Sequence, residues 1–310
     1  MNSRPFLSIV IPVFNEYSNI DRLLRCLSEN VGSLNVSFEV ILVDDGSTDD
    51  TWGLIKKLGK EYKFLNGFKL ARNFGHQHAL LAGLSMAKGQ AIISMDGDLQ
   101  HPPSLIKDLL HEHKEGALIV NTQRDDIEVS PVFKRYTSSL FYRVFSFFTD
   151  VEMNHGTSDF RLLDRKVLDE LLKLKDVDLF LRGAVEWLGY KSTTIPYKAE
   201  KRFSGDSKYT LMKMINFAKG SIISFSTKPL IIGIGLGVIT SLLAFFELIY
   251  VLIQTFRGEV VPGWASTVGI ISFLFGILFI ILGIIGAYIA RIHISLQNRP
   301  RYLIQDDTES

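Results

Sequence analysis

The chain has 310 residues, 47% of them hydrophobic, and a formal net charge of +1 at pH 7. This length allows about two domains, and the near-neutral charge gives no support for nucleic acid as a partner. The single cysteine, Cys26, cannot form an internal disulfide, which fits a reducing compartment. Because no charged and then apolar leader precedes Leu7, we expect no signal peptide.

Short apolar runs alternate with amphipathic runs as far as residue 197. This order predicts an α/β fold with a mostly parallel, twisted sheet and helices on both faces. Ser18 is expected to cap the first helix and Thr48 or Asp49 the second, because short polar side chains accept hydrogen bonds from a helix's first N–H groups. The predicted strands are residues 7–11, 38–43, 64–70, 91–95, 117–121 and 193–197, and the predicted helices are residues 18–29, 49–62, 75–87, 104–113, 131–148, 165–172 and 179–188.

Polar side chains follow most of these strands. The carboxyl ends of parallel strands share one edge of a sheet, and open α/β sheets bind their ligands there. The residues at those ends are mostly acidic or amide side chains, as a site for a nucleotide and a metal ion would need. They are Asn15, Glu16, Asp44, Asp45, Arg72, Asn73, Asp96, Asp98, Gln100 and Arg124.

The apolar run that ends at Met95 is followed by Asp96, Gly97 and Asp98. Gly97 lets the backbone turn and approach a ligand closely. Two carboxylates at the end of a strand suit Mg²⁺ or Mn²⁺, shared with substrate phosphates. The alternative is an Asp-Gly turn that caps the next helix, for which Pro103 is a suitable first-turn residue.

Two pairs of histidines have the look of metal ligands. His76 and His78 form one pair, and His111 and His113 form the other. Residues two apart on a helix point in different directions. We therefore expect neither pair to bind a metal ion.

Two long apolar runs, residues 230–253 and 267–290, each exceed the roughly 20 residues needed to cross the hydrocarbon core of a bilayer. Buried helices of a large soluble core are the alternative, but such helices rarely stay apolar all round for this length. We therefore predict a membrane domain at residues 229–292 with two transmembrane helices. The acidic Glu247 is expected to face a neighbouring helix or an interface rather than lipid. Small residues that permit close helix packing, and with it a homo-oligomer, are Gly233, Gly235, Gly237, Gly283 and Gly286.

Residues 208–228 precede the first span and are amphipathic, with Lys213 and Lys219 among their polar positions. This placement predicts an interfacial helix in the headgroup plane, and a soluble helix packed on the preceding domain is the alternative. The tail, residues 293–310, is polar and acidic after Tyr302, and we expect that part to be disordered.

Basic residues flank both predicted spans on one side of the membrane. Cytoplasmic loops carry an excess of Lys and Arg. We therefore predict an integral protein of the inner membrane whose large domain, residues 1–207, and tail are cytoplasmic. Arg257 is the single basic residue of the loop between the spans, whereas the basic residues of the flanks are Lys213, Lys219, Lys228, Arg291, Arg299 and Arg301.

Five short motifs follow one another along the chain, namely Val10–Glu16 (VIPVFNE), Val43–Asp49 (VDDGSTD), Arg72–Gly75 (RNFG), Asp96–Pro102 (DGDLQHP) and Ser158–Arg161 (SDFR). With them the chain resembles the polyprenyl-phosphate glycosyltransferases of glycosyltransferase family 2, which include the dolichyl-phosphate mannose synthases. The two predicted spans resemble the bacterial bactoprenol glucosyltransferase branch. The resemblance covers residues 5–210 by motif and the rest by architecture, and it implies a GT-A (Rossmann-like) catalytic domain.

The resemblance implies roles for the matching positions. Asp44 and Asp45 match the positions that hold the base and ribose of the donor, although a turn without a ligand is the alternative. Asp96 and Asp98 match a pair that binds Mg²⁺ or Mn²⁺, with Gln100 beside the diphosphate. The implied nucleotide-sugar-binding residues are Pro12, Asn15, Glu16, Asp44, Asp45, Arg72, Asp96, Gln100 and Arg124, and the implied acceptor-phosphate-binding residues are Arg135, Arg202, Ser207 and Lys208.

The implied catalytic residues are Asp98, Asp159 and Arg202. Asp159 matches an acidic position near the sugar, although a salt bridge to a neighbouring arginine is the alternative. Arg202 belongs to the run Arg202–Lys208 (RFSGDSK), which matches the family pattern Arg-x-x-Gly-x-Ser-Lys. No Gln-x-x-Arg-Trp motif of the processive polysaccharide synthases is present, and its absence favours transfer of a single sugar.

The implied reaction is transfer of one sugar from a nucleotide-diphospho-sugar, preferably UDP-glucose, to a polyprenyl phosphate of the undecaprenyl type. GDP-mannose is the alternative donor. A lipid phosphate is already anionic and can serve as its own nucleophile, so no Ser-His-Asp or Cys-His set is needed. Positioning and electrostatics can carry the reaction, a divalent ion can neutralise the leaving diphosphate, and direct in-line attack inverts the anomeric carbon.

Two other functions are compatible with a membrane protein of this design. A transport or flipping component needs a polar path, and two spans with one acidic residue supply little material for it. A catalytically silent scaffold would have no need of Asp96 and Asp98 together. The sequence therefore favours the glycosyltransferase.

Overall fold

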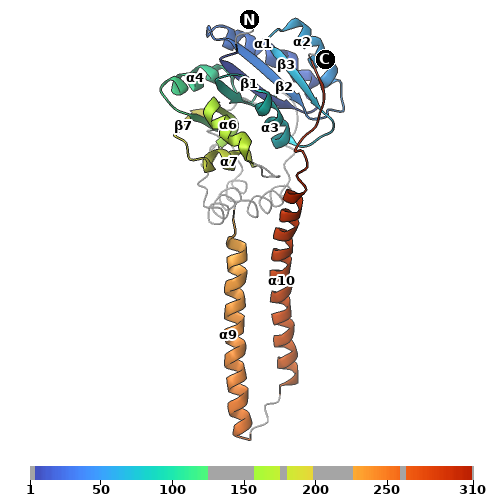
Figure 1. The fold of residues 1–310 in the computed structure, drawn as a ribbon, viewed down its shortest axis with the longest axis vertical. Coiled ribbons are helices and arrows are strands. Elements are labelled where there is room, and N and C mark those ends of the chain that lie inside the picture. The colour runs from blue at the N-terminus through green and yellow to red at the C-terminus, as the bar shows by residue number, and fades with distance from the viewer. Residues whose placement is uncertain (1–3, 125–156, 175–179, 198–225, 259–262, 309–310) are drawn as a thin grey trace. The chain divides into compact units, whose positions relative to one another are not determined.

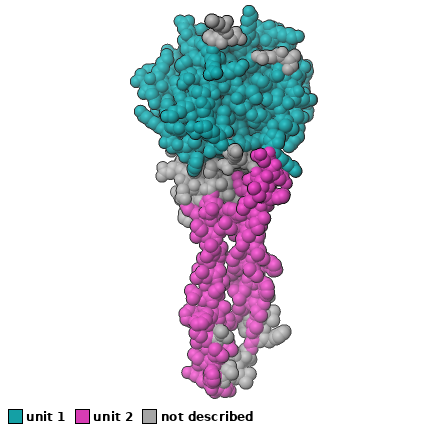
Figure 2. Space-filling model, in the orientation of Figure 1, with its two compact units in different colours: residues 1–143, 151–210, 299–310 teal, residues 144–150, 211–298 magenta. Residues whose placement is uncertain are grey.

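The computed structural model describes residues 4–124, 157–174, 180–197, 226–258 and 263–308. The chain divides into two compact units, which Figure 2 colours separately. The first comprises residues 1–143, 151–210 and 299–310, and the second residues 144–150 and 211–298. The helix predicted at residues 131–148 and most of the interfacial helix predicted at residues 208–228 lie outside the described residues.

The first unit is organised around a sheet, in which Figure 1 labels β1, β2, β3 and β7. Its described strands follow the order β7-β5-β6-β4-β1-β2-β3-β8. Strands β4, β1, β2 and β3 are parallel neighbours, and β7 is parallel to β5. Strands β6 and β8 run antiparallel to their neighbours. This arrangement confirms the predicted α/β fold. The strands are β1 Leu7–Val13, β2 Phe38–Asp44, β3 Leu65–Leu70, β4 Ala91–Ser94, β5 Ile119–Arg124, β6 Thr157–Asp164, β7 Ser192–Tyr197 and β8 Ile304–Asp307.

Helices cover both faces of this sheet, because alternate side chains of a strand point to opposite faces. In β1, Ile9 and Ile11 are buried in a core shared with α1, α2 and α4. Val10, between them, is buried in a second core shared with α3, α6 and α7. The helices of this unit are α1 Tyr17–Gly32, α2 Thr51–Glu61, α3 His76–Met86, α4 Ile106–Lys114 after a 3-10 turn at Pro103–Leu105, α6 Arg165–Lys173 and α7 Leu181–Trp187.

Helix α1 begins one residue earlier than predicted, at Tyr17, so the prediction that Ser18 caps it is wrong. Glu16 occupies the N-cap position without a side-chain cap bond. Its Oε2 instead accepts a hydrogen bond from Asn19 Nδ2 at 2.5 Å. A long acidic side chain thus fixes the first turn of the helix through a side-chain partner, a contact that capping propensity does not predict.

Helix α2 begins at Thr51 with Asp50 at its N-cap, so the prediction of Thr48 or Asp49 is also wrong. Thr48 is used elsewhere, since its backbone N–H donates to Asn15 Oδ1 at 2.8 Å. Asp49 Oδ1 accepts from the backbone N–H of Thr51 at 3.1 Å. The segment before α2 therefore joins two loops at the sheet edge instead of continuing the helix.

Strand β6 is antiparallel to β4, with Arg161 opposite Ser94. An antiparallel strand brings its amino end to the carboxyl ends of its parallel neighbours. Asp159, near the start of β6, therefore reaches the same edge as the residues after β4.

The acidic end of the chain forms β8, an antiparallel partner of β3. The prediction that the residues after Tyr302 are disordered is therefore wrong. Composition alone does not show that a short polar segment has backbone partners, and here β3 supplies an edge for it.

The second unit contains two long apolar helices, α9 Lys228–Phe256 and α10 Trp264–Leu296. They include both predicted spans, and they are long and apolar enough to cross a membrane. Their large apolar side chains are exposed, as lipid-facing residues would be; Phe246 and Phe279, for example, are 63% and 67% exposed. Glu247 is exposed on α9, and its placement at an interface stays a prediction.

Candidate active site

The loops after β1 and β2 are joined by hydrogen bonds. Asn15, in the left-handed region with φ 56°, accepts the Thr48 N–H on its Oδ1, and its own backbone N–H donates to Ser47 Oγ at 2.9 Å. The N–H of Glu16 donates to Thr51 Oγ1 at 3.1 Å. Asn15 and Glu16 thus lie at the predicted edge, where they shape the loop. Pro12 lies within β1 itself, buried and opposite Val43 of β2.

Asp44 and Asp45 differ in what their carboxylates do. Asp44 is fully buried, and its Oδ1 accepts the N–H of Ser47 at 2.9 Å. Its Oδ2 accepts no hydrogen bond from the described residues. Asp45 accepts the N–H groups of Phe74 and Gly75, at 2.7 Å and 3.0 Å, one on each oxygen. Asp44 therefore has one buried oxygen to which no described residue donates, whereas Asp45 anchors the loop before α3.

Burial raises the pKa of Asp45, and its two backbone hydrogen bonds act in the opposite direction. Gly46 follows it with φ +67°, a conformation that favours glycine. A Cβ at Gly46 would lie 2.5 Å from the carbonyl carbon of Arg72. The β2 and β3 loops therefore approach each other so closely that only glycine fits between them. Arg72 lies on this loop, with its guanidinium 4.2 Å from the ring centre of Phe74.

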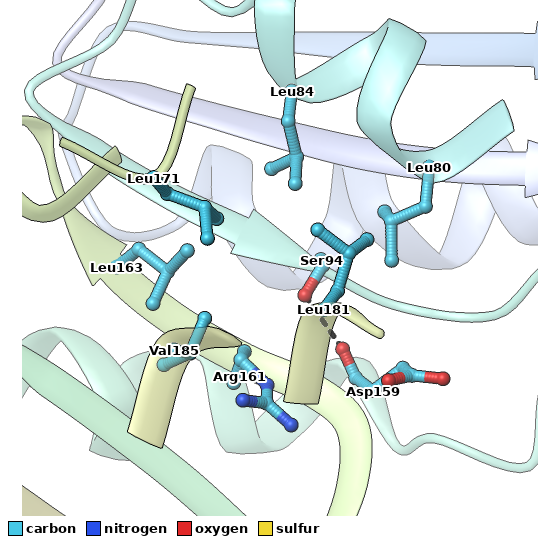
Figure 3. Close-up of a pocket in the computed structure, with 9 residues that line it drawn as sticks. All are labelled: Leu80, Leu84, Ser94, Asp159, Arg161, Leu163, Leu171, Leu181 and Val185. Atoms are coloured by element: carbon cyan, nitrogen blue, oxygen red, sulfur yellow. Dashed lines mark hydrogen bonds between the residues drawn. The ribbon is translucent and has the colours of Figure 1, made fainter. Parts of the chain in front are cut away.

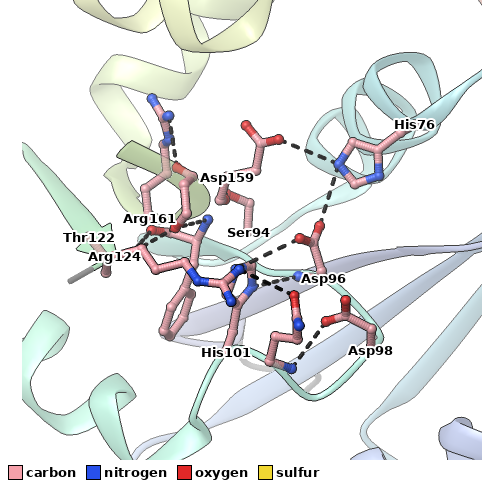
Figure 4. Close-up of polar contacts among 12 residues, drawn as sticks. His76, Ser94, Asp96, Asp98, His101, Thr122, Arg124, Asp159 and Arg161 are labelled. Atoms are coloured by element: carbon pink, nitrogen blue, oxygen red, sulfur yellow. Dashed lines mark hydrogen bonds and ion pairs between the residues drawn. The ribbon is translucent and has the colours of Figure 1, made fainter. Parts of the chain in front are cut away.

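The segment after β4 brings Asp96 and His101 together (Figure 4). His101 Nδ1 accepts the backbone N–H of Asp96 at 3.0 Å, so the proton of a neutral ring must be on Nε2. That nitrogen lies 3.7 Å from Asp96 Oδ2. His101 is buried and stacked on Phe160, 5.0 Å between ring centres, and burial lowers its pKa. A neutral imidazole thus fixes the backbone beside the first carboxylate.

Asp98, Gln100 and Arg124 form a second set of contacts at this edge. The backbone N–H of Gln100 donates to Asp98 Oδ1 at 3.1 Å. The Gln100 side-chain oxygen accepts from Arg124 at 3.3 Å. Leu99, between the two, has φ 60°, and this left-handed turn is what brings Gln100 back toward Asp98. All three residues thus lie where the sequence placed them.

Asp159 is buried and forms a two-pronged ion pair with Arg182 of α7. Arg182 Nε and one terminal nitrogen lie 2.8 Å and 2.9 Å from its two oxygens. Burial alone would raise the pKa of Asp159, but the charge and hydrogen bonds of Arg182, aided by His76 and Arg161, hold it well below its usual range. The salt bridge expected as the alternative is therefore present, and a direct catalytic role for Asp159 stays a prediction.

His76, the first residue of α3, lies between two carboxylates (Figure 4). Its Nε2 is 3.5 Å from Asp96 Oδ1 and 3.6 Å from Asp159 Oδ2. Burial lowers the pKa of His76, but the Asp159 hydrogen bond and the charges of Asp96 and Asp159 raise it by more. His76 also lies within electrostatic reach of Asp45, so it connects the two halves of the edge.

A small cavity lies behind Asp159 and Arg161 (Figure 3). Leucines of α3, α6 and α7 line it, together with Ser94, whose hydroxyl donates to the backbone oxygen of Asp159 at 2.6 Å. Its volume of about 10 Å³ suffices for about one water molecule. Arg161 is 4% exposed, and burial lowers its pKa. The cavity is therefore part of the support behind the site and too small for a substrate.

The residues after β4 supply some, but not all, of the ligands that a hard divalent cation needs. Asp96 and Asp98 offer carboxylate oxygens, and the buried Asp96 Oδ1 accepts no hydrogen bond from the described residues. Among the described residues, no set of three His, Cys, Asp or Glu side chains is arranged to hold a metal ion. Mg²⁺ and Mn²⁺ often take one or two carboxylates and complete their shell with substrate phosphates and water. The fit therefore requires the substrate.

Sequence reasoning missed three residues of this site: His76, His101 and Arg182. The two histidines were considered only as members of a pair or not at all. A signal for His76 exists, since it follows Gly75 at the start of a helix and that helix begins at the ligand-binding edge. Arg182 had no such signal, because its contact with Asp159 joins residues far apart in the chain. The predicted residues Arg135, Arg202, Ser207 and Lys208 lie outside the described residues.

Comparison with known sequences agrees with this fold. The sequence model described as Glycosyl transferase family 2 matches residues 8–172. The chain belongs to this family. An uncharacterized glycosyltransferase of Bacillus subtilis, YkcC, is 37% identical over 96% of this chain and 93% of its own. The prophage bactoprenol glucosyl transferase homolog of Escherichia coli is 33% identical over 96% of this chain and 98% of its own. This chain is thus a family 2 glycosyltransferase similar to bactoprenol glucosyl transferases over nearly its full length.

Among solved structures, the mannosyltransferase PcManGT of Pyrobaculum calidifontis, in complex with GDP-Man and Mn²⁺, is similar to this chain with a TM-score of 0.50 and 17% identity. The match covers 72% of this chain and 64% of that one. At this identity the match shows the fold alone. It agrees with the predicted GT-A fold of the first unit.

Asp159→Asn is expected to lower the free energy of unfolding by about 3–5 kcal/mol, because it removes the buried negative charge that pairs with Arg182 and acts on the buried Arg161. Denaturant unfolding of the detergent-solubilised protein measures it. Asp169→Asn is the matched control, since the Asp169 side chain is 55% exposed in its ion pair with Arg165, and it should cost less than about 1 kcal/mol. Equal small effects of the two substitutions would contradict a structural role for the Asp159 ion pair.

Proposed function

We propose that this glycosyltransferase transfers a single sugar, preferably glucose from UDP-glucose, to a polyprenyl phosphate at the cytoplasmic face of the inner membrane, with inversion at the anomeric carbon. The observation that carries the proposal is the edge where Asp96 and Asp98 follow β4 and face polar groups from the neighbouring loops. The similarity to bactoprenol glucosyl transferases supports the acceptor class. The two apolar helices support a membrane location.

The donor is assigned to the loops after β1, β2 and β3. Asp44 offers its buried Oδ2, which no described residue occupies, to an N–H or O–H of the base or ribose. Asp45 holds the Phe74–Gly75 backbone and so shapes the wall of that pocket. Arg72, and Arg124 through Gln100, supply positive charge for the diphosphate. Pro12, Asn15 and Glu16 complete the assigned donor set.

Asp96 and Asp98 are the residues that would hold Mg²⁺ or Mn²⁺. When bound, such an ion supplies Lewis-acid neutralisation of the diphosphate leaving group. The chain's own contribution is orientation: His101 fixes the Asp96 backbone, and His76 lies 3.5 Å from its side chain. Asp159, held by Arg182, is placed to orient hydroxyl groups of the sugar, since its carboxylate stays ionised.

The acceptor is assigned to basic residues between the catalytic domain and the first span. Arg202, Ser207 and Lys208 precede the first span in the sequence, and Arg135 belongs to the same proposed set. A guanidinium offers a planar fork for phosphate oxygens, whereas an ammonium is a point charge. The lipid phosphate, already anionic, attacks the anomeric carbon directly, and the nucleoside diphosphate leaves with the bonding electron pair.

The experiment that tests the proposed function is a donor screen. Membranes that contain the protein are mixed with synthetic undecaprenyl phosphate and with radiolabelled UDP-glucose, other UDP-sugars or GDP-mannose. Label should enter the lipid extract most rapidly with UDP-glucose. If only GDP-mannose labels the lipid, GDP-mannose replaces UDP-glucose as the proposed donor. If no donor labels the lipid, the proposed function is overturned in favour of the scaffold or transport alternatives.

Asp98→Asn is expected to lower the transfer rate at least about a hundredfold, because a carboxylate that binds the cation is lost. EDTA should stop the wild type, and Mg²⁺ or Mn²⁺ should restore it. Asp108→Asn, an exposed carboxylate on α4, is the matched control and should keep wild-type activity. Undiminished turnover in EDTA after extensive dialysis would remove the metal role.

Arg202→Lys is expected to lower the transfer rate at least about tenfold while donor affinity changes little, because the planar fork is lost and the charge remains. Rate and donor affinity are measured on the same preparation. The alternative is non-specific attraction of a basic segment to anionic lipid. Under that alternative the substitution is nearly silent, and a wild-type rate would exclude Arg202 from the site.

The orientation is tested with single cysteines in a Cys26→Ala background. Arg257→Cys, in the loop after α9, should react with a membrane-impermeant thiol reagent added to spheroplasts, because the basic flanks are predicted to stay inside. Gln305→Cys, exposed in β8, should react only after lysis. The reverse pattern would place the donor site outside the cell and overturn the topology.

A further inference from the structure

The C-terminal tail returns to the first unit after α10 and pairs with the outer strand of the sheet. In β8, Asp306 lies opposite Lys69 and Ile304 lies opposite Leu70. Gln305, between them, has no partner in this register and is exposed, as the extra residue of a β-bulge is. The pairing continues beyond β3, where the N–H of Ala71 donates to the Leu303 oxygen at 2.9 Å.

Side chains of the tail make specific contacts near the middle of β3. Trp52 Nε1 of α2 donates to Asp306 at 3.0 Å, and this hydrogen bond is the main cause of the lowered pKa of Asp306. The N–H of Gly67 donates to Thr308 Oγ1 at 2.9 Å. A Cβ at Gly67 would lie 2.5 Å from Ile55 Cγ2 of α2 and 2.7 Å from Thr308 Cγ2. The glycine thus leaves room in β3 for both α2 and the tail.

The tail also contacts the helix on the other side of the β3–α3 loop. The hydroxyl of Tyr302 lies 2.7 Å from Ser85 Oγ of α3. Arg301, one residue earlier, donates to the backbone oxygen of Leu174, just after α6. A segment of eight residues, from Arg301 to Thr308, therefore contacts both the strand before this loop and the helix after it.

The loop held in this way contributes to the donor half of the site. It carries Arg72, and His76 follows it as the first residue of α3. Its Phe74 and Gly75 N–H groups are the ones that Asp45 binds. None of these groups touches the tail in the contacts described above, so the tail can act on them only by fixing β3 and α3.

We propose that residues 301–308 form a positioning segment for the donor site, which holds β3 and α3 so that the loop between them keeps the conformation in which the donor binds. This inference rests on the proposed function for the identity of the donor. The link between the tail and the β3–α3 loop does not depend on that function. A tail that only covered the edge of the sheet would protect β3 from pairing with other chains. The proposed segment would in addition control the affinity for the donor.

The first experiment compares the full chain with a chain that ends at Pro300. Hydrogen exchange of the ligand-free proteins should show faster exchange at Phe74 and Gly75, by at least about tenfold, because these amides lose protection when the loop opens. A synthetic peptide of residues 301–310 should restore slow exchange. Exchange that changes only at Gly67 and Ala71, whose amides bond to the tail itself, would overturn the proposal.

The second experiment uses a variant that keeps the tail. Tyr302→Phe removes one hydroxyl contact with α3, and Gln305→Ala, at the exposed bulge, is its matched control. We expect Tyr302→Phe to raise the KM for the donor at least about threefold, with the KM for polyprenyl phosphate and the melting temperature unchanged. Equal changes in both KM values, or none, would show a merely structural tail. Failure of the wild type to transfer sugar would overturn the proposed function. The hydrogen-exchange result would still show whether the tail holds the β3–α3 loop.

Discussion

The first unit depends on how negative charge is balanced at one edge of its sheet. Like charges in a partly buried site oppose one another's ionisation, so each carboxylate needs its own compensation. Asp45 has two backbone N–H groups, and Asp159 has Arg182. Among the described residues, the Asp96 carboxylate has only two histidines near it, His76 at 3.5 Å and the neutral His101 at 3.7 Å. The remaining deficit of positive charge lies at the Asp96 side chain, and we infer that the substrate arrives with the cation that fills it.

The antiparallel direction of β6 adds Asp159 and Arg161 to the edge formed by the carboxyl ends of the parallel strands. Parallel strands alone would place Asp159 at the far end of the sheet. Because β6 runs against β4, its amino end brings Asp159 and Arg161 to the carboxyl ends of the other strands. The reach of Arg182 from α7 then stabilises a buried carboxylate beside the proposed sugar position. Direction of one strand thus decides which residues meet.

Much of the fold followed from local pattern. The apolar runs of β1, β2 and β4 are buried on both faces, so their hydrophobicity predicts them directly, and the residues after them lie at the expected edge. Contacts between segments far apart in the chain could not be predicted from local sequence pattern. Arg182 with Asp159 and Trp52 with Asp306 join residues whose meeting depends on the whole topology. A polar tail of four strand residues carries no periodic signal long enough to distinguish a strand from disorder.

We infer that Asp96 and Asp98 form an incomplete cation site which the donor diphosphate completes. Calorimetric titration of Mn²⁺ into the purified protein, with and without UDP and with GDP in parallel, tests it most directly. We predict that the accepted nucleotide tightens Mn²⁺ binding at least about tenfold, and that Mn²⁺ tightens the nucleotide by the same factor, as linkage requires. Mn²⁺ affinity that is equal with and without either nucleotide would contradict the claim.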